Sequence, residues 1–152
     1  MKFALCALDA SGKVWALPYT CLGVAYGLLG HAYGLPRSKD PGVSLGNNAI
    51  QFTGNPFVRR NAAFTLGNVI VFGAGSGPSM NGCYGDSAVN VGRHEQAHTL
   101  QYQALGLFFP PAYILAGGFS VPAGNAFERA AQLYATGQGS WWPWPPKRSI
   151  HA

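Results

Sequence analysis

The segment from Val14 to Leu35 constrains the fold more than any other part of the chain. It spans about 22 mostly apolar residues, contains no Lys, Arg, Asp or Glu, and approaches the length needed to cross a bilayer. Four glycines recur in it at spacings of four, three and four residues: Gly23, Gly27, Gly30 and Gly34. Residues at these spacings share one face of a helix, where they let another backbone approach closely. Because Pro18, Thr20 and His31 interrupt the apolar run, we expect a buried helix rather than a membrane span.

The composition fits one globular domain over residues 1–152, either as a whole protein or as part of a larger secreted one. Hydrophobic residues make up 48% of the chain and charged residues only 10%, which excludes charge-driven disorder. The basic residues occur as scattered short pairs, so we expect no nucleic-acid partner. Cys6, Cys21 and Cys83 are odd in number and widely spaced. We therefore expect them to be small buried side chains rather than a disulfide framework.

The middle of the chain predicts short strands separated by turns. Residues 37–46 are expected to form a polar turn region, and residues 73–85, which are rich in glycine, a connecting loop. Between these two segments, three strands are predicted: 49–53, 62–66 and 69–73. Gly67 and Asn68 join the last two strands as a two-residue hairpin. A small, largely antiparallel sheet is therefore expected.

The second half of the chain predicts helices with recognisable ends. Asn90 can cap a helix that runs to about Leu105, with Gly106 as its stop. Three residues are predicted to face the core from this helix: Ala97, Leu100 and Ala104. Prolines 110 and 111 open a short helical turn, and another helix runs from Asn125 to about Thr136. The aromatic tail, 141–146, is predicted to cover apolar core, with a substrate lip or a partner-docking segment as the alternative. Together with the strands, these helices indicate an α+β fold.

The sequence His94-Glu95-Gln96-Ala97-His98 matches the pattern His-Glu-x-x-His. Four helical residues make slightly more than one turn and about 6 Å of rise, so both imidazoles project from one face and can bind one ion. Glu95 lies beside them and can act as a general base toward a water that the ion makes more acidic. Two neutral imidazoles leave most of the ion's charge in place. We therefore expect a third, anionic ligand and an open position for water.

Glu128 is the predicted third ligand. The chain has two glutamates, and Glu128 lies thirty residues beyond His98 on a separate predicted helix. No other acidic residue follows Glu95. Asn125 and Glu128 also match a capping box, in which the glutamate returns to the amide of the cap residue. A capping role for Glu128 is therefore an alternative, and the two roles can coexist.

Other polar residues are candidates for supporting roles. Gln101 shares the helix face of His94 and His98, so it can orient a ligand or the bound water, or else make a plain surface contact. Three tyrosines are candidate donors to a developing oxyanion, with core or rim packing as the alternative: Tyr102, Tyr113 and Tyr134. His31 is isolated on an apolar helix and is predicted to pack in the core, with a catalytic donor as the alternative.

Two stretches, HEQAHTLQYQAL at 94–105 and NAFERAA at 125–131, resemble the zincin metallopeptidases whose third ligand is a glutamate, the gluzincins. A longer run, covering about two thirds of the chain, is similar to the metallopeptidase domain at the C-terminus of some bacterial type VI secretion spike proteins. This run comprises LGNNAIQF at 45–52, FTLGNVIVF at 64–72, and HEQAHTLQYQALG with its FFPPAY continuation. Position 104 is Ala rather than His, which disfavours the metzincin branch.

The resemblance implies a compact, minimal zincin-like domain. Its parts would be a backing helix at 17–34, a small sheet whose edge strand lies along the cleft, an active-site helix and a glutamate helix, which is the order of elements given above. It implies a zinc metallopeptidase with one Zn²⁺ per chain, held by His94, His98 and Glu128, in which Glu95 is the catalytic residue. The substrate would be a peptide or protein.

The resemblance further implies an antibacterial effector toxin. Such a domain would be delivered by the type VI machine without a signal peptide and would act in the periplasm of a target bacterium, with an immunity protein or a secretion carrier as partner. Two alternatives are carried beside it. One is a metal-binding but catalytically inactive module. The other is a membrane-acting toxin built on residues 14–35, although membrane contact is not otherwise expected.

Overall fold

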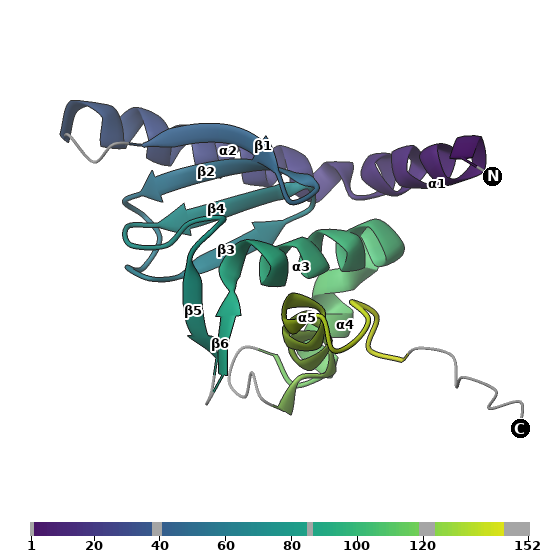
Figure 1. Ribbon diagram of the computed structural model, residues 1–152. Helices are drawn as coiled ribbons and strands as arrows, with labels where there is room; N and C mark the ends of the chain where they lie inside the picture. The colour runs from purple at the N-terminus through teal and green to yellow at the C-terminus, as the bar shows by residue number, and fades with distance from the viewer. Residues whose placement is uncertain (1, 38–40, 85–86, 119–123, 145–152) are drawn as a thin grey trace, which may run out of the picture.

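The computed structural model describes residues 2–37, 41–84, 87–118 and 124–144 and has an α+β fold (Figure 1). It begins with two helices, α1 (Lys2–Trp15) and α2 (Leu17–Gly34), followed by a short 3-10 helix, η1 (Leu35–Arg37). Helix α2 has the bounds predicted for the backing helix, whereas α1 was not predicted. Within the described part of the chain, every helix is too short or too polar to span a bilayer.

Four strands form a mixed sheet in the order β1-β2-β4-β3. Their bounds are β1 (Gly42–Gly46), β2 (Ala49–Asn55), β3 (Ala63–Leu66) and β4 (Val69–Gly73). Strands β2 and β4 run parallel, and the two outer pairs are antiparallel. The predicted hairpin is confirmed, because Gly67 and Asn68 connect β3 to β4 and Leu66 pairs with Val69. The arrangement leaves β3 at one edge of the sheet.

Two segments predicted as turns or loops contain strands instead. Strand β1 lies within the predicted turn region 37–46 and pairs with β2 across Asn47 and Asn48, whose φ angles are 48° and 60°. Two successive residues with positive φ are typical of a type I′ hairpin turn, so the missed signal was this asparagine pair. Strand β5 (Asn81–Tyr84) lies within the predicted glycine-rich loop and pairs antiparallel with β6 (Ser87–Asn90).

Helix α2 packs on the sheet through its glycine face. All four predicted glycines are buried there. A Cβ atom on Gly23 would lie 2.7 Å from the Cβ of Val69, and one on Gly27 would lie 2.6 Å from Cγ of Phe52. Both distances are shorter than an ordinary carbon–carbon contact of about 3.5–4.0 Å. The helix can approach the sheet this closely because these positions have no side chain.

Helix α3 (Val91–Leu105) lies against the other face of the sheet (Figure 1). Strand β4 is buried along its whole length because its side chains alternate between the two sides. Val69 and Val71 pack in the cluster next to α2, while Ile70 and Phe72 pack with Val91 of α3.

Three further helical elements follow α3 in the chain: η2 (Gly106–Phe108), α4 (Phe109–Leu115) and α5 (Ala126–Thr136). A third apolar cluster joins α3, α4 and α5 around Tyr102, Phe109 and Phe127. Trp142 packs against this cluster, as predicted for the tail, whereas Trp144 is 60% exposed. The remaining tail positions, 145 and 146, lie outside the described residues.

Two predictions about burial are wrong. Cys21 and Cys83 are exposed free cysteines rather than buried side chains, and Cys21 is exposed because the sheet-facing side of α2 is occupied by the glycines. The side chain of Cys6 lies outside the described structure. Of the three residues predicted to face the core from α3, Ala97 is fully buried as predicted, whereas Leu100 is only half-buried and Ala104 is exposed. The buried surface of α3 is centred on its polar residues, because the helix lies between the sheet and α5 and is covered on both of these sides.

Candidate metal centre

Helix α3 begins and ends where the sequence predicted. The side chain of Asn90 accepts a 2.8 Å hydrogen bond from the backbone N–H of Arg93, which satisfies one of the free amides of the first turn. At the other end, Gly106 has a φ of 54°, a conformation that favours glycine. These two ends fix the helical register and place His94 and His98 one turn apart on the buried side.

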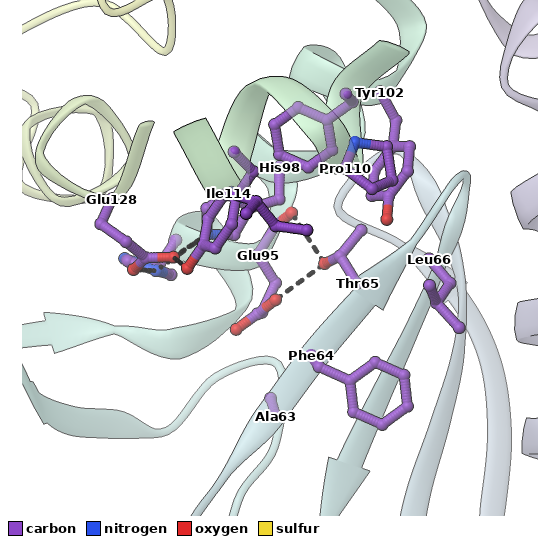
Figure 2. A pocket seen from close by; sticks show the side chains of 13 residues that line it. Ala63, Phe64, Thr65, Leu66, Glu95, His98, Tyr102, Pro110, Ile114 and Glu128 are labelled. Atoms are coloured by element: carbon purple, nitrogen blue, oxygen red, sulfur yellow. Dashed lines mark hydrogen bonds and ion pairs between the residues drawn. The ribbon is translucent and has the colours of Figure 1, made fainter. Parts of the chain in front are cut away.

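His94, His98 and Glu128 converge from α3 and α5, and His98 and Glu128 are labelled in Figure 2. The Nε2 atoms of the two histidines are 3.2 Å apart. Oε2 of Glu128 lies 3.2 Å from Nε2 of His94, and Oε1 of Glu128 lies 3.2 Å from Nε2 of His98. Both histidines are buried, and the side chain of Glu128 is 15% exposed. The three side chains thus form a buried group that could hold a metal ion.

These distances fit a tetrahedral divalent ion. With metal–ligand bonds of about 2.0–2.1 Å, two ligand atoms of a tetrahedral zinc site are about 3.3 Å apart. The 3.2 Å between the two Nε2 atoms is close to this value, and each Nε2 lies 3.2 Å from a different oxygen of Glu128. With one ligand atom taken from each residue, all three lie within 4.8 Å of one another. Two imidazole nitrogens and a carboxylate also form a donor set that zinc commonly takes, although other divalent ions accept it.

Glu128 is directed to the histidines rather than to its own helix end. The cap of α5 is made by Asn125, whose side chain accepts a 2.9 Å hydrogen bond from the N–H of Phe127. The carboxylate of Glu128 instead accepts a 2.6 Å hydrogen bond from the hydroxyl of Tyr113, a residue of α4. Three elements therefore hold this carboxylate in place, and the capping-box alternative is not needed to explain its position.

The electrostatics of the group favour a cation. Burial acts to raise the pKa of Glu128, but hydrogen bonds and charge from His94 and His98 outweigh it and hold the pKa well below its usual range. Burial acts to lower the pKa of His98, but Glu128 outweighs it and raises that pKa to about 9. Burial, together with the charge of Glu128, keeps the pKa of Tyr113 above its usual range, so this hydroxyl stays a neutral donor.

Gln101 contacts His98 at Nδ1, the ring nitrogen that does not face Glu128. Its Oε1 lies 2.8 Å from Nδ1 of His98, on the side of the ring opposite the Glu128 carboxylate. The amide nitrogen of Gln101 donates to two backbone carbonyls, those of Phe127 and Trp141. The sequence placed Gln101 on the correct helix face but could not identify these partners.

Glu95 faces the cleft beside the histidines and contacts the edge strand. The hydroxyl of Thr65 on β3 donates a 2.7 Å hydrogen bond to Oε2 of Glu95 (Figure 2). Thr65 also lies 3.2 Å from the backbone oxygen of Glu95. Sequence reasoning missed Thr65, because threonine is an ordinary strand residue and nothing local marks it as a partner of the helix.

An open cleft of about 510 Å³ runs across these residues. It is lined by the edge strand, by the site face of α3, by α4 and by Glu128, as follows: Ala63, Phe64, Thr65, Leu66, His94, Glu95, His98, Tyr102, Phe109, Pro110, Tyr113, Ile114 and Glu128. The volume falls in the range of ligand-binding clefts, about 300–1,000 Å³. Apart from the polar residues already described, the walls are apolar.

The other predicted site residues have different positions. Tyr102 lines the cleft but is 4% exposed, packs in the apolar cluster around Phe109, and has its pKa raised by burial. Tyr134 is not among the cleft-lining residues of the described chain, and its ring lies 5.5 Å from the guanidinium of Arg93. His31 is half-buried on α2, across the sheet from α3.

Comparisons of the chain with protein-family models, with curated proteins and with solved structures find no match. The fold and the geometry of the site are therefore the basis for assigning a function. They define an α+β protein with a candidate metal site of two histidines and a glutamate.

Proposed function

We propose that this protein is a zinc-dependent metallopeptidase. The observation that carries the proposal is the convergence of His94, His98 and Glu128, whose ligand atoms lie within 4.8 Å of one another in the lining of an open cleft. These three residues would hold the ion. A divalent ion in this position supplies Lewis acidity, which makes water more acidic and polarises a substrate carbonyl.

Glu95 is the residue best suited to move the proton. It lies one residue after His94 and lines the same cleft. Thr65 engages its Oε2, which fixes the carboxylate and leaves Oε1 for the attacking water. In the proposed reaction Glu95 takes a proton from that water and then gives it to the leaving amine nitrogen as the peptide bond breaks.

The open edge of the sheet supports an extended peptide as the substrate. The N–H of Gly73 donates to the carbonyl of Ala62, and the pair Leu66–Val69 flanks the two-residue hairpin. In an antiparallel ladder the hydrogen-bonded residues alternate, so the backbone groups of Ala63 and Thr65 point away from β4. A substrate strand could pair with them as an added strand.

The apolar cleft walls favour a large apolar side chain near the scissile bond. Phe64 and Leu66 come from the edge strand, and Pro110 and Ile114 from α4. Among the residues that line the cleft, the charged or ionisable ones other than the tyrosines are the two histidines and the two glutamates. Peptides with a bulky apolar residue should therefore be cleaved faster than acidic ones.

The test uses the full chain and a library of quenched fluorescent peptides. The wild type should bind one zinc ion and cleave apolar peptides, and a chelator should abolish cleavage. Glu95→Gln should keep the zinc ion while turnover falls by about 10²–10⁴-fold, the usual contribution of general acid–base catalysis. Glu128→Ala should lose the zinc ion. Unchanged turnover in Glu95→Gln would remove its assigned role, and zinc binding with no cleavage of any peptide would favour the inactive-module alternative.

The toxin role is a further part of the proposal and rests on the sequence resemblance to the secretion-spike metallopeptidase domain. It places the action in the periplasm of a target bacterium, with an immunity protein or secretion carrier as partner. Expression of the chain in a Gram-negative host with an added periplasmic signal should stop growth, whereas Glu95→Gln should not. Equal growth of the two strains would contradict the toxin role without affecting the peptidase proposal.

A further inference from the structure

Gln101 joins three parts of the molecule through one buried amide. Its side chain has no exposed surface. The amide oxygen lies 2.8 Å from Nδ1 of His98 on its own helix. The amide nitrogen lies 3.2 Å from the carbonyl oxygen of Phe127, on α5, and 2.8 Å from that of Trp141, in the segment that follows α5.

These partners determine which way the amide faces. Backbone carbonyls only accept hydrogen bonds, so the NH₂ group of Gln101 must be the end that meets Phe127 and Trp141. The amide oxygen is then left to face His98, and an oxygen there requires that Nδ1 of His98 carry the hydrogen. This leaves Nε2 as the ligand atom, directed at Glu128 and His94. The carbonyl of Trp141 thus helps to set the tautomer of a residue 43 positions earlier in the chain.

A second contact leads from the same segment to the other ligand helix. Phe127, which directly precedes Glu128, is fully buried. Its ring centroid lies 5.3 Å from that of Phe109 on the cleft side. It also lies 6.5 Å from the ring of Trp142 and 5.5 Å from the ring of Trp144, both nearly edge-on. The two tryptophans therefore pack against α5 at Phe127, the residue next to the ligand.

We propose that the segment Trp141–Trp144 is a strap that holds the metal ligands in position, and that Gln101 is the positioning residue through which it acts on His98. The strap acts on Glu128 through the ring of Phe127. This inference rests on the metal site of the proposed function. Outer contacts of this kind typically change metal affinity by about 10–100-fold when they are removed.

The chain offers a matched control on the same helix. The amide nitrogen of Gln103 donates a 2.7 Å hydrogen bond to Oδ1 of Asn68, in a partly buried position. Gln103 does not line the cleft. Gln101→Leu and Gln103→Leu therefore each remove one glutamine amide from α3. Only the first removes a contact to a proposed ligand.

The experiment measures zinc affinity of the full chain by competition with a chromogenic chelator, and the visible absorption spectrum of the cobalt-loaded protein. Gln101→Leu should weaken zinc binding by about 10–100-fold and alter the cobalt spectrum, whereas Gln103→Leu should change the affinity less than about threefold. The double variant Trp142→Ala/Trp144→Ala should weaken zinc binding as well. Its effect should be smaller when it is added to Gln101→Leu than when it is made alone, because loosening the segment also weakens the Gln101–Trp141 hydrogen bond, which Gln101→Leu has already removed.

The outcomes separate the strap from the metal site itself. If folded Gln101→Leu binds zinc as tightly as Gln103→Leu, or if the double tryptophan variant binds as tightly as the wild type, the strap proposal is overturned while the metal site stands. If the wild type binds neither zinc nor cobalt, the metal site is overturned and the strap with it. If Gln101→Leu does not fold by far-UV circular dichroism, the tryptophan variants decide, since Trp144 is 60% exposed and tolerates truncation better.

Discussion

Replacing Gly23 with alanine should destabilise this protein, although the same change stabilises most helices. In an exposed helix interior, alanine is favoured over glycine by about 1 kcal/mol. Gly23 is buried in the middle of α2. A Cβ atom there would lie 2.7 Å from Cβ of Val69 and 2.9 Å from the carbonyl oxygen of Leu66. The backbone clash therefore opposes the helix propensity, and the two effects can be compared.

The steric clash should outweigh the gain in helix propensity. An ordinary contact between carbon atoms is about 3.5–4.0 Å, so α2 and the sheet would have to separate by roughly 1 Å. Alanine has no rotamer that avoids the contact, and Val69 is fully buried within β4. Overpacking of this kind costs about 1–3 kcal/mol, and a site that cannot relax lies near the upper end. The net loss in the free energy of unfolding should be about 2 kcal/mol after the gain in propensity is subtracted.

The assay is urea denaturation followed by far-UV circular dichroism, with Ala25→Gly as the control. Ala25 lies on the exposed side of the same helix, so this change should lose about 1 kcal/mol through propensity alone. Gly23→Ala should lower the midpoint with an unchanged slope, and its thermal midpoint should fall by about 4–8 °C. A Gly23→Ala protein that is more stable than the wild type would refute the close approach of α2 to the sheet.

Three further predictions concern the site and its helices. Zinc binding at pH 7 should release about one proton, because burial lowers the pKa of His98 but Glu128 outweighs it and raises that pKa to about 9. Titration calorimetry in buffers of different ionisation enthalpy should detect this proton. Binding heats that do not depend on the buffer would contradict the prediction. In the metal-free protein the same raised pKa contributes stability that is fully present below pH 6.5 and is lost as the pH rises through about 9, so the free energy of unfolding should fall across this window. A His98→Asn variant should lack that component, and an identical pH profile would exclude it. Asn90→Ala should lower the free energy of unfolding by about 1 kcal/mol, because it removes the N-cap of α3. A loss below about 0.3 kcal/mol in denaturant titrations would show that this hydrogen bond does not stabilise the helix end.

The parts of the fold that could be predicted are those specified by local chemistry. The limits of α3 and α5 depend on residues at or next to the helix ends, an asparagine cap at one end and a glycine at the other, and both helices lie where predicted. The face of α2 was predictable because glycine spacing alone defines it. Strand β1 was missed because Pro41 and Gly42 at its start were interpreted as turn residues and the Asn47–Asn48 turn that pairs it with β2 was not recognised.

The candidate site divides in the same way. His94 and His98 lie one helical turn apart, and Glu128 was singled out by the scarcity of acidic residues, so this group could be proposed without coordinates. The contacts that support this group could not be predicted from the sequence. Thr65 reaches Glu95 across 30 positions of sequence, and Gln101 reaches Trp141 across 40. Such pairs depend on how strands and helices are packed against each other, which no local pattern records.

The buried side of α3 has a consequence for the life of the protein in a cell. Five of the residues that it hides from water are polar: His94, Glu95, His98, Thr99 and Gln101. Such a helix gains little from the hydrophobic effect on that side and depends on specific partners. If zinc is one of them, a free concentration 1,000 times the dissociation constant adds about 4 kcal/mol to stability. The supply of metal would then set how long the chain survives proteases as well as whether it can react, and a metal-poor environment would shorten its working lifetime.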